Sequence, residues 1–477
     1  MPGFKGITMT ITKTISVAAL LVLLTTAGPV LAQDPQQELE PQQEQTGADP
    51  AGNEQPIQAA AAAEPDIETL EQQSQEAYAA QKWVRYYGAN IRLMNQRPYE
   101  PIYMKRVIEA CALLERRRTA YHYLLQMQKQ GLSYDFRETP DAANIRTTEL
   151  FDYLTDLMLE AGQPAGIAQN VVTMDAHYGV PSALTWDQSR ERVLVGTLSQ
   201  GAIVSLGQDG SQEVLIQADV NNGLWAVTGL HADADNNRLW VSTSAIPEFA
   251  QYSPADEGRA ALLELDLATL QQINRYNVPM DGYLHDLGTL TVADSGDVYV
   301  LDHGTSSVFR KAADGQALEP FVGSAEMDSL SAIAVSSDNR RLYLADLYKG
   351  ILVVDPIERS FVMMSGPENL NLGRINSLAY GDRKLFMIQS DIQPERLMQL
   401  DLDDMGTGAT ESLPMASAME QFDGPGLALY KGGFVYYFAN LDNGDGEAYQ
   451  LVKTPLASLE NKTEFELDNS PEAVDGD

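Results

Sequence analysis

Two histidine–aspartate pairs stand close together in the sequence, His285-Asp286 and Asp302-His303. Imidazole titrates near neutral pH, so a histidine beside a carboxylate can accept and return a proton in acid–base chemistry. The same groups, joined by other oxygen donors, can bind a metal ion. We therefore take His285, Asp286 and His303 as candidate catalytic residues, with structural or solvated roles for the histidines as the alternative.

Other polar side chains stand at similar places, next to short apolar strands. The candidate ligand-binding residues are Tyr252, Asp302, Asp346, Lys349, Asp391, Arg396 and Asn440, and the candidate metal ligand is Asn376. Asp302 and Asp346 follow their strands at equivalent positions, so the capping of a turn is an alternative explanation for both.

A repeat in the second half of the chain predicts the elements that position these residues. Segments such as GTLTVADSGDVYVLDHGTSSVFRKAADG and SAIAVSSDNRRLYLADLYKGILVVDPIE contain a strand, a polar turn, a second strand, a loop and a third strand. First strands begin near 183, 229, 289, 332, 377 and 426, and a fourth short strand lies between units. Four strands in about 45 residues are typical of a propeller blade. The sequence predicts a mainly β fold, a six-bladed β-propeller of four-stranded antiparallel blades over residues 168–456.

The sixth unit ends after its third strand, near Lys453. The stretch VVTMDAHYG at 171–179 has strand character and no partner in the first unit, so we expect it to supply the missing strand and close the ring. The candidate residues then share one mouth of the propeller, built from loops that join the second strand to the third and each blade to the next. An insertion at 245–260, which contains Tyr252, lies at the same mouth as a lid or as a plain surface excursion.

Residues 66–165 show helical periodicity and predict an all-α helical-hairpin module. The segment TAYHYLLQMQKQGL resembles a tetratricopeptide-like hairpin, and the module holds about two hairpins and a capping helix. Because such repeats usually need about three copies for stability, we expect the module to lean on the next domain. From Lys82 to Arg118 there are nine Lys or Arg and three Glu. This is either a solvated helix face or a docking surface for something acidic, which includes the chain's own second domain.

The repeated sequence pattern (N/D)GLA…LYVAD…ILxVD, over roughly residues 171–455, resembles that of the six-bladed propellers of the regucalcin and gluconolactonase family, with strictosidine synthase-like proteins as relatives. The resemblance implies a divalent cation such as Ca²⁺ at the propeller centre, held by a Glu and by Asn or Asp residues ahead of the innermost strands, which polarises a lactone carbonyl. Those positions fall near Ser182, on Ser331-Ala332 and on Asn376-Ser377, and only Asn376 offers a suitable oxygen ligand.

Composition and targeting signals narrow the classes of function. The chain has 477 residues, 44% of them hydrophobic, and a net charge of −35, which argues against sequence-independent binding to nucleic acid and to anionic lipid. Residues 1–32 are typical of a signal peptide cut after Ala32, which predicts a periplasmic or secreted protein with no membrane span after cleavage. Residues 33–65 are expected to be a disordered linker and residues 457–477 an acidic tail.

Two functions follow from these observations. The first is a protein that binds a small molecule or a cell-envelope protein at the propeller mouth. The alternative is a metal-dependent lactone or ester hydrolase, with His285, Asp286, His303 and Asn376 around the metal.

Overall fold

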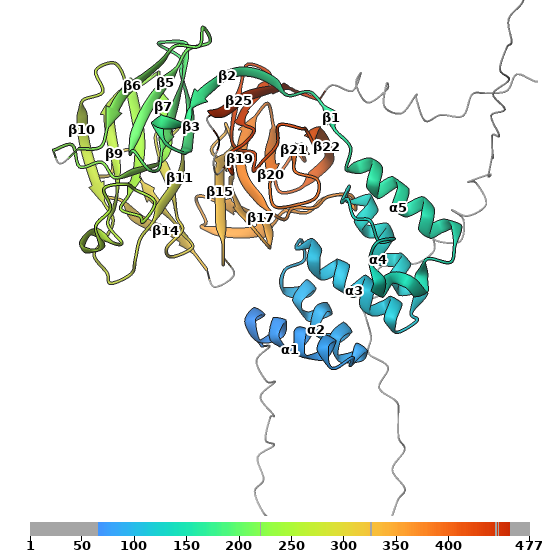
Figure 1. The fold of residues 1–477 in the computed structure, drawn as a ribbon. Helices are drawn as coiled ribbons and strands as arrows, with labels where there is room; N and C mark the ends of the chain where they lie inside the picture. The colour runs from blue at the N-terminus through green and yellow to red at the C-terminus, as the bar shows by residue number, and fades with distance from the viewer. Residues whose placement is uncertain (1–64, 220, 325–326, 444–445, 447, 458–477) are drawn as a thin grey trace, which may run out of the picture. The chain divides into compact units, whose positions relative to one another are not determined.

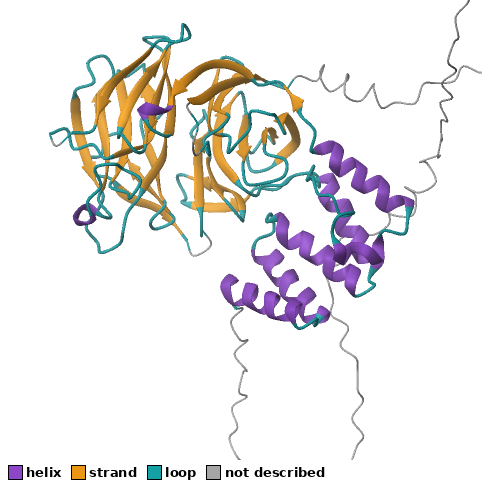
Figure 2. Ribbon diagram, viewed as in Figure 1, coloured by secondary structure: helices purple, strands orange, loops and turns teal. Residues whose placement is uncertain are grey.

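The computed structural model describes residues 65–219, 221–324, 327–443, 446 and 448–457. Helices come first along the chain and β-sheets follow (Figures 1 and 2). The expected signal peptide, the linker up to residue 64 and the tail after Ala457 lie outside the described residues. Among the residues described, no helix is long and apolar enough to cross a membrane.

The helical segment begins and ends its helices with ordinary capping signals. Asp66 accepts a hydrogen bond from Thr69 N (2.7 Å) before the first helix, and Thr148 accepts one from Phe151 N (3.2 Å) before the last. The α-helices are α1 (Ile67–Ala79), α2 (Trp83–Gln96), α3 (Pro101–Leu113), α4 (Arg117–Lys129) and α5 (Glu149–Ala161).

Six antiparallel sheets follow in a regular order, five with four strands and one with a short fifth strand at its edge. Blade 1 contains β3 (Pro181–Asp187), β4 (Arg192–Thr197), β5 (Ala202–Leu206) and β6 (Gln212–Gln217). Blade 2 contains β7 (Ala226–Asp233), β8 (Arg238–Ser244), β9 (Ala260–Asp266) and β10 (Gln272–Asn277). Blade 3 contains β11 (Leu287–Val292), β12 (Val298–Asp302), β13 (Ser307–Lys311) and β14 (Glu319–Gly323).

The last three blades repeat this pattern. Blade 4 contains β15 (Leu330–Val335), β16 (Leu342–Asp346), β17 (Gly350–Asp355) and β18 (Ser360–Met363). Blade 5 contains β19 (Ile375–Gly381), β20 (Lys384–Gln389), β21 (Arg396–Leu402) and β22 (Ala409–Ser417), with the short β1 (Ala165–Gly166) at its edge. Blade 6 contains β23 (Gly426–Lys431), β24 (Phe434–Phe438), β25 (Ala448–Pro455) and β2 (Gln169–Asp175).

Strand β2 closes the ring, as the sequence predicts. It pairs antiparallel with β25 in the register Val172↔Leu451 and Met174↔Tyr449, and Figure 1 labels the two strands side by side. The first strands of neighbouring blades touch in turn from β3 to β23, and β23 touches β3 again. Apolar side chains between the sheets form the cores that hold neighbouring blades together.

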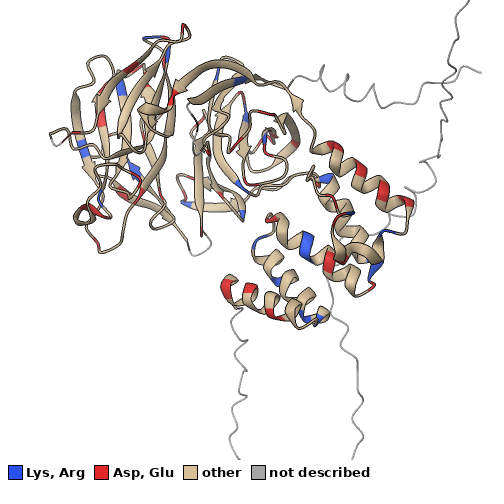
Figure 3. Cartoon of the chain, viewed as in Figure 1, with Lys and Arg blue, Asp and Glu red and all other residues tan. Residues whose placement is uncertain are grey.

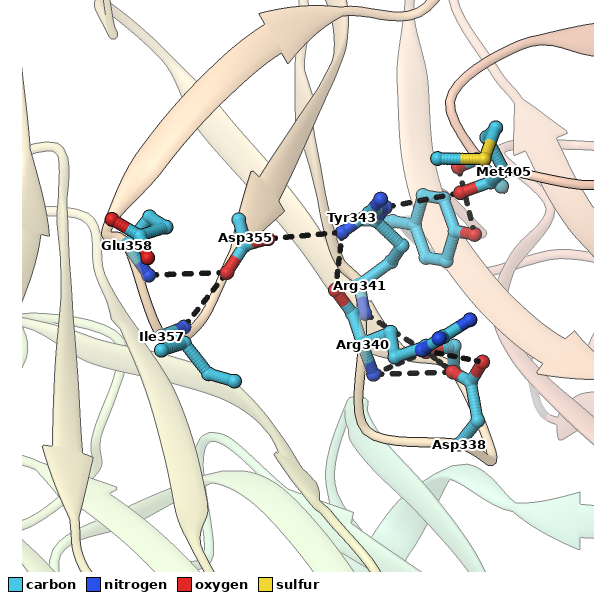
Figure 4. A network of polar contacts seen from close by, with 10 residues as sticks. Asp338, Arg340, Arg341, Tyr343, Asp355, Ile357, Glu358 and Met405 are labelled. Atoms are coloured by element: carbon cyan, nitrogen blue, oxygen red, sulfur yellow. Dashed lines mark hydrogen bonds and ion pairs between the residues drawn. The ribbon is translucent and has the colours of Figure 1, made fainter.

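Polar contacts also join neighbouring blades at the end of the strands opposite the mouth. In Figure 4, Arg341 Nε donates to Met405 O (3.1 Å) and the hydroxyl of Tyr343 donates to Gly406 O (3.0 Å). Both acceptors belong to the turn after β21 of blade 5. Arg341 also binds Asp355 within its own blade (3.2 Å). One hairpin of blade 4 therefore satisfies backbone carbonyls of blade 5.

The helical segment packs on blades 4 and 5. Ile392, from the loop between β20 and β21, is buried in the core formed by α3, α4 and α5, and Tyr99 packs against the core of blades 4 and 5. The Arg374 guanidinium forms an ion pair with the buried Glu100 (2.5 Å). The expectation that the helices lean on the next domain is confirmed by these contacts.

Candidate functional site at the propeller mouth

The two histidine–aspartate pairs meet in blade 3. His285 and Asp286 precede β11, Asp302 ends β12 and His303 follows it, and the antiparallel register pairs Leu287 with Asp302. The two pairs lie about one hairpin apart in the sequence, and the register of that hairpin brings them together in space. We call these four residues the His–Asp group.

Asp302 organises the group from within. Its buried carboxylate accepts hydrogen bonds from His285 Nδ1 (2.7 Å), Asp286 N (2.8 Å) and Gly304 N (3.1 Å). The other ring nitrogen of His285 lies 3.1 Å from Asp281 Oδ1. Burial opposes the charged imidazole, but Asp302 and Asp281 outweigh burial and raise the pKa of His285. Both ring nitrogens of His285 are therefore engaged, and this residue holds the loop in place.

His303 presents the open face of the group. Its side chain is exposed, and Nδ1 donates to Leu330 O (2.8 Å) at the start of blade 4. A neutral ring held in this way leaves Nε2 as an acceptor. Position 288 must be glycine for this arrangement, because a Cβ there would overlap Nε2 of His303.

Asp286 lies beside this imidazole. Burial raises the pKa of the Asp286 carboxyl; the charge that His303 carries when it is protonated opposes that shift, and the charges of Asp302 and Glu248 add to it. A carboxyl with a raised pKa that interacts with the charge of an imidazole is a candidate for proton transfer. Asp286 and His303 are thus the members of the His–Asp group that can meet a ligand.

An apolar rim adjoins the group and was not predicted from the sequence. Met280, Tyr283 and Leu284 are 98%, 70% and 59% exposed on the loop that leads into His285. Three large apolar side chains on one short loop, open to solvent, are typical of a contact surface. The signal was present in the sequence, since the loop MDGYLHD is more apolar than a solvated turn.

Asp346 occupies the blade 4 position equivalent to Asp302. Its carboxylate accepts from the backbone N–H groups of Asp328 (3.0 Å), Ser329 (2.9 Å), Tyr348 (2.9 Å) and Lys349 (3.0 Å). The Lys349 ammonium lies 2.8 Å from Asp328 Oδ2. These contacts match the turn-capping explanation for Asp346 and give its oxygens partners within the protein.

The loops of blades 5 and 6 bring several carboxylates together. Burial raises the pKa of Asp442, and the charges of Asp391 and Asp423 add to the shift. Burial also raises the pKa of Glu395. Asn440 is used internally, since its amide donates to a backbone carbonyl (3.1 Å) and accepts from a backbone N–H (2.7 Å). Within the described ranges, no three His, Cys, Asp or Glu side chains are arranged to hold a metal ion.

The positions that correspond to the resemblance's metal ligands link neighbouring blades. Each lies at a bulge in a first strand. Ser182 Oγ donates to Val227 O (2.5 Å), Ser331 Oγ to Ile375 O (2.5 Å) and Asn376 Nδ2 to Pro425 O (2.7 Å). Hydroxyl and amide donors directed at carbonyls do not suit a dication. At these three positions the described residues leave one buried oxygen, Asn376 Oδ1, without a hydrogen-bond partner. The residues present do not fit the divalent cation that the resemblance implies.

The insertion of blade 2 is fastened to blade 1. Phe249 is buried in the core shared by these blades, with Tyr252 packed against that core. Ala250 N donates to Ser199 O (2.9 Å) and Ala245 N to Arg259 O (2.9 Å). These contacts fix the insertion against blade 1, and Tyr252 serves as one of its packing residues.

Arg396 lies where the helices meet the propeller. Its buried guanidinium donates to Gln130 O (3.0 Å) and Gly131 O (3.2 Å), just past the end of α4, and to Gln389 Oε1 (2.7 Å). Burial lowers the pKa of Arg396 to about 10. A cation at a helix C-terminus meets the partial negative charge of its carbonyls. This geometry gives Arg396 a docking role in place of the expected ligand contact.

No family model matches the sequence, and no curated protein matches it. Among solved structures, a gluconolactonase from Xanthomonas campestris is 14% identical, with 62% of this chain and 99% of that chain covered and a TM-score of 0.40. The PQQ-bound aldose sugar dehydrogenase from Streptomyces coelicolor is 13% identical, with 61% and 99% covered and a TM-score of 0.42. A luciferin-regenerating enzyme is 11% identical, with 62% and 96% covered and a TM-score of 0.43. The arrangement of strands resembles those of these structures.

Proposed function

We propose that this chain is a binding protein of the cell envelope or exterior that holds a protein partner at the propeller mouth. The supporting observation is the apolar rim, Met280, Tyr283 and Leu284, next to the open imidazole of His303. Tyrosine and methionine are enriched at the centres of protein interfaces, and a polar group beside them sets orientation. The rim side chains stand out into solvent, which suits a protein surface better than an enclosed small molecule.

The test compares partners captured by matched variants of the mature chain. Met280→Ser combined with Tyr283→Ser removes the rim, and Ile357→Ser removes a residue that is 85% exposed at the other end of blade 4. Crosslinking in living cells, followed by quantitative mass spectrometry, should show an envelope protein enriched by the native chain and by Ile357→Ser. Truncation of a hot-spot side chain costs about 2 kcal/mol or more of binding free energy. The rim variant should therefore enrich this partner at least about tenfold less than the native chain. Equal enrichment by all three chains would refute the proposal.

A second candidate function, hydrolysis of a lactone or ester, is favoured by the geometry of His303 and Asp286. The His303 ring donates through Nδ1 to Leu330 O, so Nε2 can take a proton from a water molecule that attacks a carbonyl. This chemistry needs the imidazole and the open mouth, and Asp286 alongside can stabilise the charged ring.

Hydrolysis of a panel of lactones and esters by the purified chain tests this candidate. His303→Gln should lower the rate about 10²–10⁴-fold, the usual contribution of general base catalysis. His122→Gln, the same change at an exposed position of α4, serves as the control. A rate that is unaffected by His303→Gln contradicts this second function and leaves the binding proposal untouched.

A further inference from the structure

The helical segment carries cations that have no partner among the described residues. Lys105 and Arg106 form ion pairs with Glu109 (2.6 Å) and Glu71 (2.7 Å). In contrast, the side chains of Lys82 (just before α2), of Arg85 and Arg92 in α2, and of Arg117 and Arg118 in α4 have no hydrogen bond or ion pair with any residue that the structure describes. In a chain with a net charge of −35, three unpaired cations gathered at α2 are a specific feature rather than a general property of the surface.

Three of these cations line a groove between α1 and α2. The groove has a volume of about 400 Å³ and is lined by Gln73, Glu76, Ala77, Lys82, Arg85, Gly88, Ala89 and Arg92. We call it the basic groove. Its floor is low at Gly88, where an added Cβ would meet no atom within 4 Å. Glu76, the single acid of the lining, accepts a hydrogen bond from Gln72 (2.9 Å). Figure 3 colours the Lys and Arg positions of the helices blue and the Asp and Glu positions red.

We propose that the acidic tail of this chain, residues 458–477, docks in the basic groove. The tail carries seven acids and one lysine. Its central stretch, EFELD at 464–468, places Phe465 and Leu467 between carboxylates. Extended acidic segments bind Arg and Lys side chains through charge-assisted hydrogen bonds, and an aromatic ring can stack on a guanidinium. A floor of glycine and alanine leaves room for such a ring.

Contacts within the molecule place the groove within reach of the tail. Ala457 N, at the last described residue, donates to Gln399 Oε1 of β21 (3.2 Å). The same strand begins at Arg396, which binds the end of α4. Arg97, just after α2, stacks on Tyr348 of blade 4 (3.7 Å), and Arg92 lies about 8 Å back along the helix. Twenty extended residues span up to about 66 Å.

Zero-length carbodiimide crosslinking of the full chain tests the proposal, because it joins a lysine to a carboxylate only at ion-pair distance. At low salt, Lys82 should crosslink to Glu464, Glu466 or Asp468 within one chain. A mixture of isotope-labelled and unlabelled chains separates links within a chain from links between chains. The yield should fall at least tenfold in 0.5 M salt, as expected for an exposed electrostatic contact.

Charge-reversal pairs supply the matched control. Arg85→Glu combined with Arg92→Glu should remove the Lys82–tail crosslink, while Arg117→Glu combined with Arg118→Glu makes the same change of charge outside the groove and should leave it. Amide exchange provides a second measurement: α1 and α2 should exchange at least twofold faster in a chain that ends at Ala457. Links only between chains, links from Lys82 to another acidic segment, equal losses in both variants, or no link with unchanged exchange would each overturn the proposal.

Discussion

Asp302 and Arg396 are buried charged side chains whose hydrogen-bonding atoms are used by the protein itself. Asp302 receives a ring nitrogen and two backbone N–H groups at the mouth. Arg396 supplies donors to two carbonyls past α4 and to Gln389. A buried charge is tolerated only when such partners compensate its desolvation. Each residue therefore organises local backbone in blades 3 and 5.

Replacing Arg396 by alanine should destabilise the protein. The change leaves the carbonyls of Gln130 and Gly131 and the amide of Gln389 without a donor, and each unsatisfied buried group costs about 1–3 kcal/mol. We expect a loss of about 2–4 kcal/mol in the free energy of unfolding, measured by urea denaturation. Arg383→Ala, whose ion pair with Asp404 is exposed, should change it by less than about 0.5 kcal/mol. Equal effects of the two variants would contradict the docking role of Arg396.

His285 should make stability depend on pH. Burial works against the charged imidazole, but Asp302 and Asp281 raise the pKa of His285 above its unfolded value of about 6.5. The imidazole therefore contributes stability that is fully present below about pH 6.5 and is lost as the pH rises through the folded pKa. The difference in unfolding free energy between the native chain and His285→Gln should shrink from pH 6 to pH 9. A difference that is constant over this range would refute the assignment.

Strand β2 shows how one short element controls a whole ring. It comes from upstream of the first blade and completes blade 6 against β25, so the two ends of the propeller are joined by hydrogen bonds. Its side chains alternate, with Val172 and Met174 buried and Thr173 and Asp175 exposed. This alternation is the period of a strand with one covered face.

Met174→Ala should therefore weaken the entire propeller. Truncation of a fully buried methionine leaves a cavity and costs about 2–5 kcal/mol. Thr173→Ala, on the exposed face of the same strand, is the control and should cost less than about 1 kcal/mol. Thermal unfolding followed by circular dichroism should show one transition that moves to lower temperature in Met174→Ala alone. A separate early transition of blade 6 would mean that β2 stabilises only its own sheet.

The bulges in the first strands show that one sequence position can serve different purposes. Ser182, Ser331 and Asn376 each donate to a carbonyl of the following blade. His303 makes the corresponding contact from blade 3 to Leu330 of blade 4. The ring is thus held near its axis by polar side chains as well as by the apolar cores between blades. Because these side chains are used in contacts between blades, they provide few ligand atoms for a cation.

At the scale of the whole molecule, helices and propeller form one structural unit. Ile392 enters the helical core, Tyr99 enters the core of blades 4 and 5, and Glu100 pairs with Arg374. The salt bridge between Lys129 and Glu368 (2.5 Å) adds a contact at the surface. The helices are therefore held at the mouth side of blades 4 and 5, where loops would otherwise be open.

Gly373→Ala should separate the two parts. Gly373 has no positive φ, so alanine suits its own backbone, but a Cβ there would overlap the carbonyl oxygen of Tyr99. Overpacking of this kind costs about 1–3 kcal/mol. We expect this cost to weaken the packing of the helices on the propeller. Limited proteolysis should cut between α2 and α3 at least about fivefold faster than in the native chain. Gly88→Ala, which meets no neighbour, is the control, and equal cleavage of both variants would contradict this role of Gly373.

The repeat in the sequence by itself determined the blades, their number and the closing strand, because strand period and turn residues act over short stretches of chain. It also placed His285, Asp286, Asp302 and His303 in one blade, since they border strands of one hairpin. The tertiary structure alone decided which side chains face outward. Arg396 became a docking residue, Asp346 a cap and the rim at Met280 a surface, because burial depends on which distant segments pack together, and local sequence carries no record of those neighbours.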